Sequence, residues 1–105
     1  MTTIIRTKLG THRGSRRVWF EGTHLMKEGF LPGMKFDVEK YESHIIIRLN
    51  IEGKYKISKR TRGGKAIPII DLTFQELAVI FDGIQIIESI MDNGTITITG
   101  CRKPA

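Results

Sequence analysis

An internal repeat of about fifty residues limits what this chain can fold into more than any other feature. Shifting the sequence by fifty positions without a gap places Thr11 on Thr61 and Gly14 on Gly64. The further matches are Glu21 on Asp71, Thr23 on Thr73, Gly33 on Gly83 and Ile46 on Ile96. Turns, basic stretches and apolar runs coincide in the two halves. We therefore predict a single domain, residues 1–105, made of two repeats of about residues 2–50 and 52–100.

Each half is expected to contain a strand, a basic loop, a strand, a short helix and two more strands. Residues 4–9 and 55–59 alternate with period two, which is typical of a strand. Thr23 and Thr73 stand where an N-cap would, predicting helices over 23–28 and 73–81. Asn93-Gly94 is a strong hairpin signal. The other strands are expected at 17–21, 35–41, 44–49, 66–72, 84–91 and 95–100.

The two repeats predict a fold in which the apolar faces of the two halves pack against each other. A fifty-residue unit of this kind has an apolar face that it cannot bury alone, and two units can bury these faces against each other. We predict a mainly β protein with two short helices, folded as a closed or nearly closed pseudo-twofold β-barrel from two ββαββ repeats. Trp19 and Phe20 lie over Ile69 and Ile70, so we expect both in the core, with base stacking as the alternative.

The positive charge is concentrated in two stretches. Seventeen Lys and Arg against eleven Asp and Glu give a net charge of +6, which favours a polyanionic partner such as nucleic acid or an acidic protein surface. Residues 1–20 and 54–65 contain no acidic residue. Guanidinium groups on glycine-flanked loops suit phosphates and guanine edges, because Arg offers a planar fork of donors. The alternative is ordinary solvated charge on surface loops.

The sequence contains no pattern that predicts a metal site or catalysis. Cys101 is the single cysteine, so neither an intramolecular disulfide nor a cysteine-based zinc cluster is expected. Glu21 and Asp71 are the one acidic pair at equivalent positions of the two repeats, and we expect each to order a helix entrance or to pair with a basic neighbour rather than to converge in a catalytic site. Metal-ligand spacing is absent from the histidines, which are His12, His24 and His44. We predict a binding protein without catalytic residues, cofactor or metal.

The chain is expected to act in the cytoplasm. Its first residues run into basic side chains instead of the apolar stretch of a signal peptide. No window approaches the roughly 20 apolar residues of a membrane span. We therefore expect no export and no membrane partner.

Residues 57–72, ISKRTRGGKAIPIIDL, resemble the N-terminal half of the SpoVT/AbrB swapped-hairpin domain. That family carries a basic strand, a Gly-Arg or Gly-Lys turn, an apolar strand with an embedded Ile-Pro and a short helix. The first copy is similar to the SymE branch of the same superfamily through residues 17–22, RVWFEG, followed by Leu25, Gly29-Phe30 and Gly33. Together the similarities cover most of residues 3–100.

The resemblance implies a DNA-binding pseudobarrel in which basic residues of the first strand and the following loop contact DNA. Family members usually pair two chains by swapping hairpins, whereas here both halves lie on one chain, which leaves further homodimerisation open. Val18-Trp19 replaces the Ile-Pro in the first copy. His12 lies in the basic loop, either on phosphate or merely solvated. The implied contacts are Arg6, Lys8, Arg13, Arg16 and Arg17 in the first copy and Lys56, Lys59, Arg60, Arg62 and Lys65 in the second.

The expected function is binding of double-stranded DNA, as a transcriptional regulator or an accessory module that targets a DNA-acting system. A first alternative is a SymE-like RNA-binding toxin. A second is a small mobile-element or phage protein that inhibits a host nucleic-acid-acting protein. A third is a freestanding copy of a targeting domain otherwise fused to an enzyme such as a DNA methyltransferase.

Overall fold

A computed structural model describes residues 2–101; the predicted domain of residues 1–105 extends beyond this range at both ends. The described residues form strands throughout, with two short helices. The first half contains β1 (Thr2–Lys8), β2 (Gly10–His12), β3 (Ser15–Glu21), α1 (Thr23–Lys27), β4 (Lys35–Lys40) and β5 (His44–Leu49). The second contains β6 (Tyr55–Lys56), β7 (Ser58–Arg62), β8 (Lys65–Leu72), α2 (Leu77–Ile80), β9 (Ile86–Asp92) and β10 (Thr95–Cys101).

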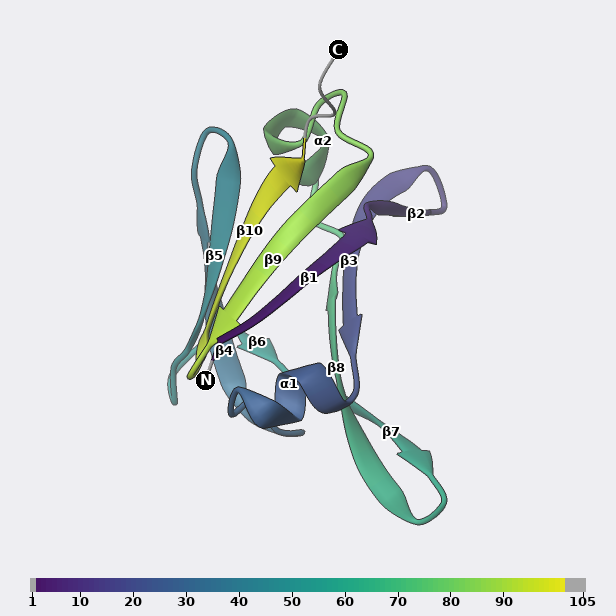
Figure 1. The fold of residues 1–105 in the computed structure, drawn as a ribbon, viewed down its shortest axis with the longest axis vertical. Coiled ribbons are helices and arrows are strands. Elements are labelled where there is room, and N and C mark those ends of the chain that lie inside the picture. The colour runs from purple at the N-terminus through teal and green to yellow at the C-terminus, as the bar shows by residue number, and fades with distance from the viewer. Residues whose placement is uncertain (1, 102–105) are drawn as a thin grey trace.

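The strands form two antiparallel sheets (Figure 1). The six-stranded sheet has the order β1-β9-β10-β5-β4-β6, and the four-stranded sheet has the order β2-β3-β8-β7. Each strand has a counterpart in the other half, for example β6 for β1 and β8 for β3. When every strand is replaced by its counterpart, each sheet keeps the same order, read from its opposite edge. Strands of the two halves are therefore neighbours in both sheets.

The register of the central strands obeys the fifty-residue shift. Phe20 of β3 lies opposite Ile70 of β8, so this pair maps onto itself. In the other sheet Ile45 lies opposite Ile98, and the shift turns this pair into Thr95 opposite Arg48, which is also observed. A duplicated unit would require this symmetric pairing; the duplication itself stays a prediction from the sequence.

The prediction of a closed barrel is wrong for the residues that the structure describes. The chain passes from the six-stranded to the four-stranded sheet at two buried residues, Leu9 between β1 and β2 and Ile57 between β6 and β7. β2, which follows Leu9, has three residues, and β6, which precedes Ile57, has two. Such short segments cannot connect the sheet edges by hydrogen bonds, so the sheets remain separate and β1, β6, β2 and β7 end them.

One contiguous apolar core joins the two sheets and both helices. Alternation along β3 directs Val18 and Phe20 inward, and both helices bury a leucine, Leu25 or Leu77. Burial of this apolar surface is the main favourable contribution to folding. The largest fully buried side chains are Phe30, Phe36, Phe81, Leu25, Ile45, Ile47, Ile57, Ile70, Leu72, Leu77, Ile87 and Met91.

The helices differ from the prediction at their starts. Gly22, with φ of 97°, is the N-cap of α1, since its carbonyl accepts the amides of Leu25 and Met26. The expected helix over 73–81 is observed only over Leu77–Ile80, because Phe74 turns inward to pack against the core before the helix begins. Neither helix has a side-chain cap, and neither is long and apolar enough to span a membrane among residues 2–101.

A buried carboxylate connects α1 to the six-stranded sheet. Glu28 is 2% exposed and accepts hydrogen bonds from Thr3 Oγ1 at 2.7 Å and from the Asn93 amide at 3.2 Å. Its own carbonyl accepts the Gly94 amide at 2.8 Å. These donors, the Thr3 hydroxyl first, lower the pKa of Glu28. The beginning of β1 and the β9–β10 turn are therefore fixed to the end of α1.

Candidate nucleic-acid interface

The four-stranded sheet consists of two basic hairpins, β2–β3 and β7–β8, joined along β3 and β8. Because β3 and β8 are antiparallel, the two tips point to opposite ends of the molecule (Figure 1). Gly14 lies six residues before Phe20, and Gly64 lies six residues before Ile70, in opposite directions from this opposed pair. The two tips are therefore about twelve strand positions, or about 40 Å, apart. The longest dimension of the molecule is 44 Å.

The positive charge is segregated into this sheet. Residues 10–21 and 58–72 carry seven Lys and Arg against two carboxylates, those of Glu21 and Asp71. The rest of the described chain carries eight Lys and Arg against nine carboxylates. The four-stranded sheet is therefore strongly basic, while the remainder is close to neutral.

In the β2–β3 hairpin two of the arginines are engaged by the protein itself. Arg17 donates two hydrogen bonds to the Asp71 carboxylate, at 2.9 and 3.0 Å, which raise the pKa of Arg17. Arg16 is half-buried, and its guanidinium donates to the Ile84 carbonyl. Arg13 at the tip and His12 beside it are exposed. This hairpin presents mainly Arg13 to an incoming ligand.

The tip of this hairpin has an unusual residue for its conformation. Arg13 has φ of 52° and Gly14 has φ of 83°, and the flanking His12 and Ser15 are paired, as in a two-residue turn. Such turns favour Asn, Asp or Gly, because a Cβ is strained at positive φ. The second hairpin has Gly63-Gly64 there. Arginine at this position holds a guanidinium at the tip in spite of that strain.

In the β7–β8 hairpin most of the cations face solvent. All five residues of β7 are exposed, and so is Lys65 after the turn. Arg60 pairs with Glu21 at 3.1 Å. Lys59, Arg62 and Lys65 take part in no ion pair among residues 2–101. We call these three side chains the β7–β8 cations.

Trp19 lies on the outer face of the four-stranded sheet, so the prediction that it is in the core is wrong. It is 36% exposed, with the Arg17 guanidinium 4.2 Å from the ring centroid and Nε1 donating to Glu21 at 3.3 Å. Since Val18 and Phe20 point inward, the alternation of a strand turns Trp19 outward. Phe20 is buried, as predicted. This alternation was the sequence signal that could have placed Trp19 correctly.

The acidic pair Glu21 and Asp71 neutralises arginines of the sheet. Asp71 of β8 binds Arg17 of β3, and Glu21 of β3 binds Arg60 of β7. Each carboxylate therefore binds an arginine of the other hairpin. This is the expected pairing with basic neighbours, although the sequence did not identify which neighbours they would be.

The other predicted contacts lie in the six-stranded sheet, away from both tips. Arg6 of β1 pairs with Glu88 at 2.9 Å, which raises the pKa of Arg6. Lys8 ends the same strand, and Lys56 of β6 lies opposite Lys35 of β4. The structure therefore gathers eight of the eleven predicted side chains in the four-stranded sheet and leaves these three outside it.

Residues 2–101 contain no group of three or more His, Cys, Asp or Glu side chains arranged to hold a metal ion. No protein-family model, curated protein or solved structure matches the chain. The four-stranded sheet must therefore be interpreted from its own charge and geometry.

Proposed function

We propose that this chain binds nucleic acid, and duplex DNA in particular, through the tips of its two basic hairpins. The observation that carries the proposal is the set of β7–β8 cations, which project from an exposed strand and turn. Phosphate groups are the natural partners of such side chains, and counterion release on their neutralisation favours binding. The chain acts as a binding protein, a regulator or targeting module, without chemistry of its own.

The spacing of the tips supports a duplex as the ligand. Successive turns of B-form DNA are about 35 Å apart on one side of the helix, close to the roughly 40 Å between Gly14 and Gly64. Arg13 and the β7–β8 cations would then meet the same side of the duplex about one helical turn apart. A protein with twofold symmetry can match a duplex in this way, because the protein presents two equivalent hairpin tips and the duplex presents equivalent phosphates on successive turns.

We further propose that the fold is the swapped-hairpin arrangement of the SpoVT/AbrB superfamily within one chain. Two pairings support this: β1 of the first half lies beside β9 of the second, and β6 of the second lies beside β4 of the first. Each half thus completes the sheet of the other. The pseudo-twofold axis would run between Phe20 and Ile70, the pair that the repeat maps onto itself.

A duplex-length series tests the proposal. Fluorescence anisotropy with labelled duplexes of 8 and 20 base pairs, at several salt concentrations, should show tighter binding and a steeper salt dependence for the longer duplex. With four phosphate contacts the slope of log K against log salt should be about −3.6. Equal slopes for the two lengths would mean that only one tip binds, and a slope near zero would refute phosphate contact.

Single-stranded RNA is a second candidate, favoured by the exposure of Trp19. An outward aromatic on a basic sheet can stack on unpaired bases. The Arg17 guanidinium already covers one face of this ring, which leaves less of it for a base. Equal or tighter binding of a single-stranded RNA in the same assay would replace the duplex proposal with this one.

A further inference from the structure

The loop between β5 and β6 displays an isoleucine at a fixed position. Ile51, between β5 and β6, is 93% exposed. The loop around it is closely bonded to β4: the Asn50 amide donates to the Lys35 carbonyl at 3.0 Å, and the Gly53 amide donates to the Asn50 carbonyl at 2.8 Å. The hydrogen bonds of this loop hold the Ile51 side chain in solvent, where it gains none of the free energy of hydrophobic burial.

Side chains fasten the same loop further. The Asp37 carboxylate accepts the Lys54 amide at 3.1 Å and Asn50 Nδ2 at 2.7 Å, and these bonds lower the pKa of Asp37. Gly53 lies so close to β4 that an added Cβ would be 2.5 Å from the Phe36 carbonyl oxygen. Only glycine permits this approach. The position of Ile51 is therefore built into the fold.

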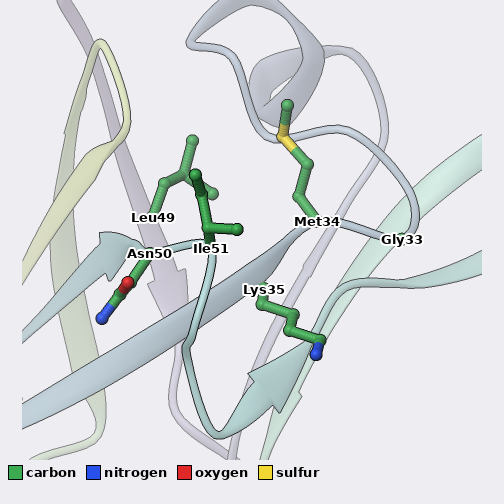
Figure 2. A pocket seen from close by; sticks show the side chains of 6 residues that line it. All are labelled: Gly33, Met34, Lys35, Leu49, Asn50 and Ile51. Carbon is green, nitrogen blue, oxygen red and sulfur yellow. The ribbon is translucent and has the colours of Figure 1, made fainter.

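Ile51 borders an open apolar pocket of about 500 Å³ (Figure 2). Met34, which is 39% exposed, stands across the pocket from Leu49 and Ile51, and Lys35 lies at its rim. The pocket thus combines apolar side chains from the end of β5, the loop before β4 and the Ile51 loop.

The second half of the molecule closes the corresponding place with its own side chain. Fifty positions after Met34 stands Ile84, which is only 5% exposed. Fifty positions after Asn50 stands Gly100, where an added Cβ would be 2.9 Å from the Ile84 side chain. Ile84 therefore packs directly on Gly100, whereas the first half leaves its pocket open.

One lysine, Lys35, lines the open pocket, and a second faces it from the next strand. Lys35 and Lys56 lie directly opposite each other on β4 and β6, and like charges in this arrangement repel. Lys54 follows the loop. The ion pairs found among residues 2–101 include none of these three lysines. A negatively charged ligand would relieve the repulsion between Lys35 and Lys56.

We propose that this pocket, lined by Lys35, Met34, Leu49 and Ile51 and with Lys56 opposite Lys35 on the neighbouring strand, binds an acidic segment of a partner protein through one or two apolar anchor side chains. The charge of the lysines selects the acidic flanks, and the pocket takes the anchor. A nucleic acid would satisfy the lysines but leave Met34 and Ile51 without an apolar contact. The pocket contains no residue of either hairpin, and the proposal does not depend on the proposed function, although Gly33 and Lys56 also line a second hollow that includes Lys59 of β7.

The test uses the full chain labelled with ¹⁵N and three synthetic peptides. The first carries two leucines among Asp and Glu, the second has serines in place of the leucines, and the third has lysines in place of the acids. The first peptide should shift the amide signals of Met34, Lys35 and Ile51, and the other two should bind at least about tenfold more weakly.

Variants of the chain locate the site. Ile51→Ser with Met34→Ser should weaken the acidic peptide about tenfold, and Lys35→Gln with Lys56→Gln should weaken it by a similar factor. Val79→Ser is the matched control, since Val79 of α2 is also apolar and 77% exposed, and it should leave the affinity unchanged. All five positions are exposed, and the amide spectra report directly whether each variant is folded.

Several results would overturn the proposal: no binding of the acidic peptide, equal binding of the serine or lysine peptide, or unchanged affinity in the Ile51→Ser and Met34→Ser variant. A duplex DNA or RNA oligonucleotide that shifts these same amides would also overturn it, by assigning the surface to nucleic acid. Replacing the β7–β8 cations with glutamine should leave peptide binding intact, so this site and the hairpin tips can fail independently.

Discussion

The two hairpins of the four-stranded sheet occupy equivalent places in the fold but use their cations differently. In the β2–β3 hairpin, Arg17 is held by Asp71 and Arg16 by a backbone carbonyl. In the β7–β8 hairpin, Lys59, Arg62 and Lys65 extend into solvent. Equivalent topology therefore does not imply equivalent binding. The difference depends on which carboxylates and carbonyls lie within reach of each strand.

The comparison predicts that the β7–β8 hairpin provides most of the affinity for duplex DNA. Changing Lys59, Arg62 and Lys65 to glutamine should lower the affinity about five-hundredfold near 0.1 M salt and reduce the magnitude of the salt slope by about 2.7, because three phosphate contacts are lost. Anisotropy with a 20-base-pair duplex measures both. The matched control removes the same number of charges outside the four-stranded sheet, at Lys27, Lys35 and Lys54. An equal loss of DNA affinity in the control would show that the effect comes from net charge and not from the β7–β8 hairpin.

The other hairpin should contribute less, through a single side chain. Arg13→Gln removes the exposed tip guanidinium, and we expect about an eightfold loss of affinity and a salt slope smaller in magnitude by about 0.9. The same assay measures it. A loss as large as that of the triple variant would make the two hairpins equal and refute the asymmetry.

Releasing an engaged arginine should make the first hairpin more like the second. Asp71→Asn frees Arg17 and removes a nearby negative charge, so duplex affinity should rise about threefold with a steeper salt dependence. The stability change should stay within about 1 kcal/mol, because the pair is partly exposed. Unchanged or weaker DNA binding in this variant would show that Arg17 is structural only.

Exchanging the tips tests whether the strain at Arg13 serves binding. Arg13→Gly gives the first hairpin the Gly-Gly turn of the second and relieves a non-glycine residue at positive φ. The free energy of unfolding in urea should rise by about 0.5 kcal/mol, since the relief of strain exceeds the entropic cost of glycine. Duplex affinity should fall as in Arg13→Gln. Lower stability together with unchanged affinity would contradict this interpretation.

Much of the fold followed from local patterns. The alternating segments became strands, the Asn93-Gly94 turn joins β9 and β10 as expected, and the two helices lie in the predicted places. The start of α2 was less predictable, because Phe74 packs against the core ahead of the helix. Closure of the barrel was not predictable either, since it depends on how far β2 extends after Leu9 and how far β6 extends before Ile57.

The candidate site was predicted only as a set of residues. The sequence located both basic hairpins, but it grouped Arg6, Lys8 and Lys56 with them, although these lie in the other sheet. It also counted Arg17 and Arg60 as available, while the fold pairs them with Asp71 and Glu21. These partners are 54 and 39 positions away along the chain, so only the strand register brings them together.

The sequence by itself determined where both helices and most strands lie, the spacing of the two halves and the sign of the charge, because turns, alternation and net charge are local or additive properties. The predicted ββαββ order is wrong in each half, since β2 lies inside the predicted basic loop and the predicted strand 55–59 is divided at Ile57. The tertiary structure decided which cations are neutralised, that Trp19 faces outward between Arg17 and Glu21, and that the pocket at Met34 is open while Ile84 closes its counterpart. These outcomes depend on side chains from distant strands meeting in one register. Two similar halves can therefore differ in what they leave exposed.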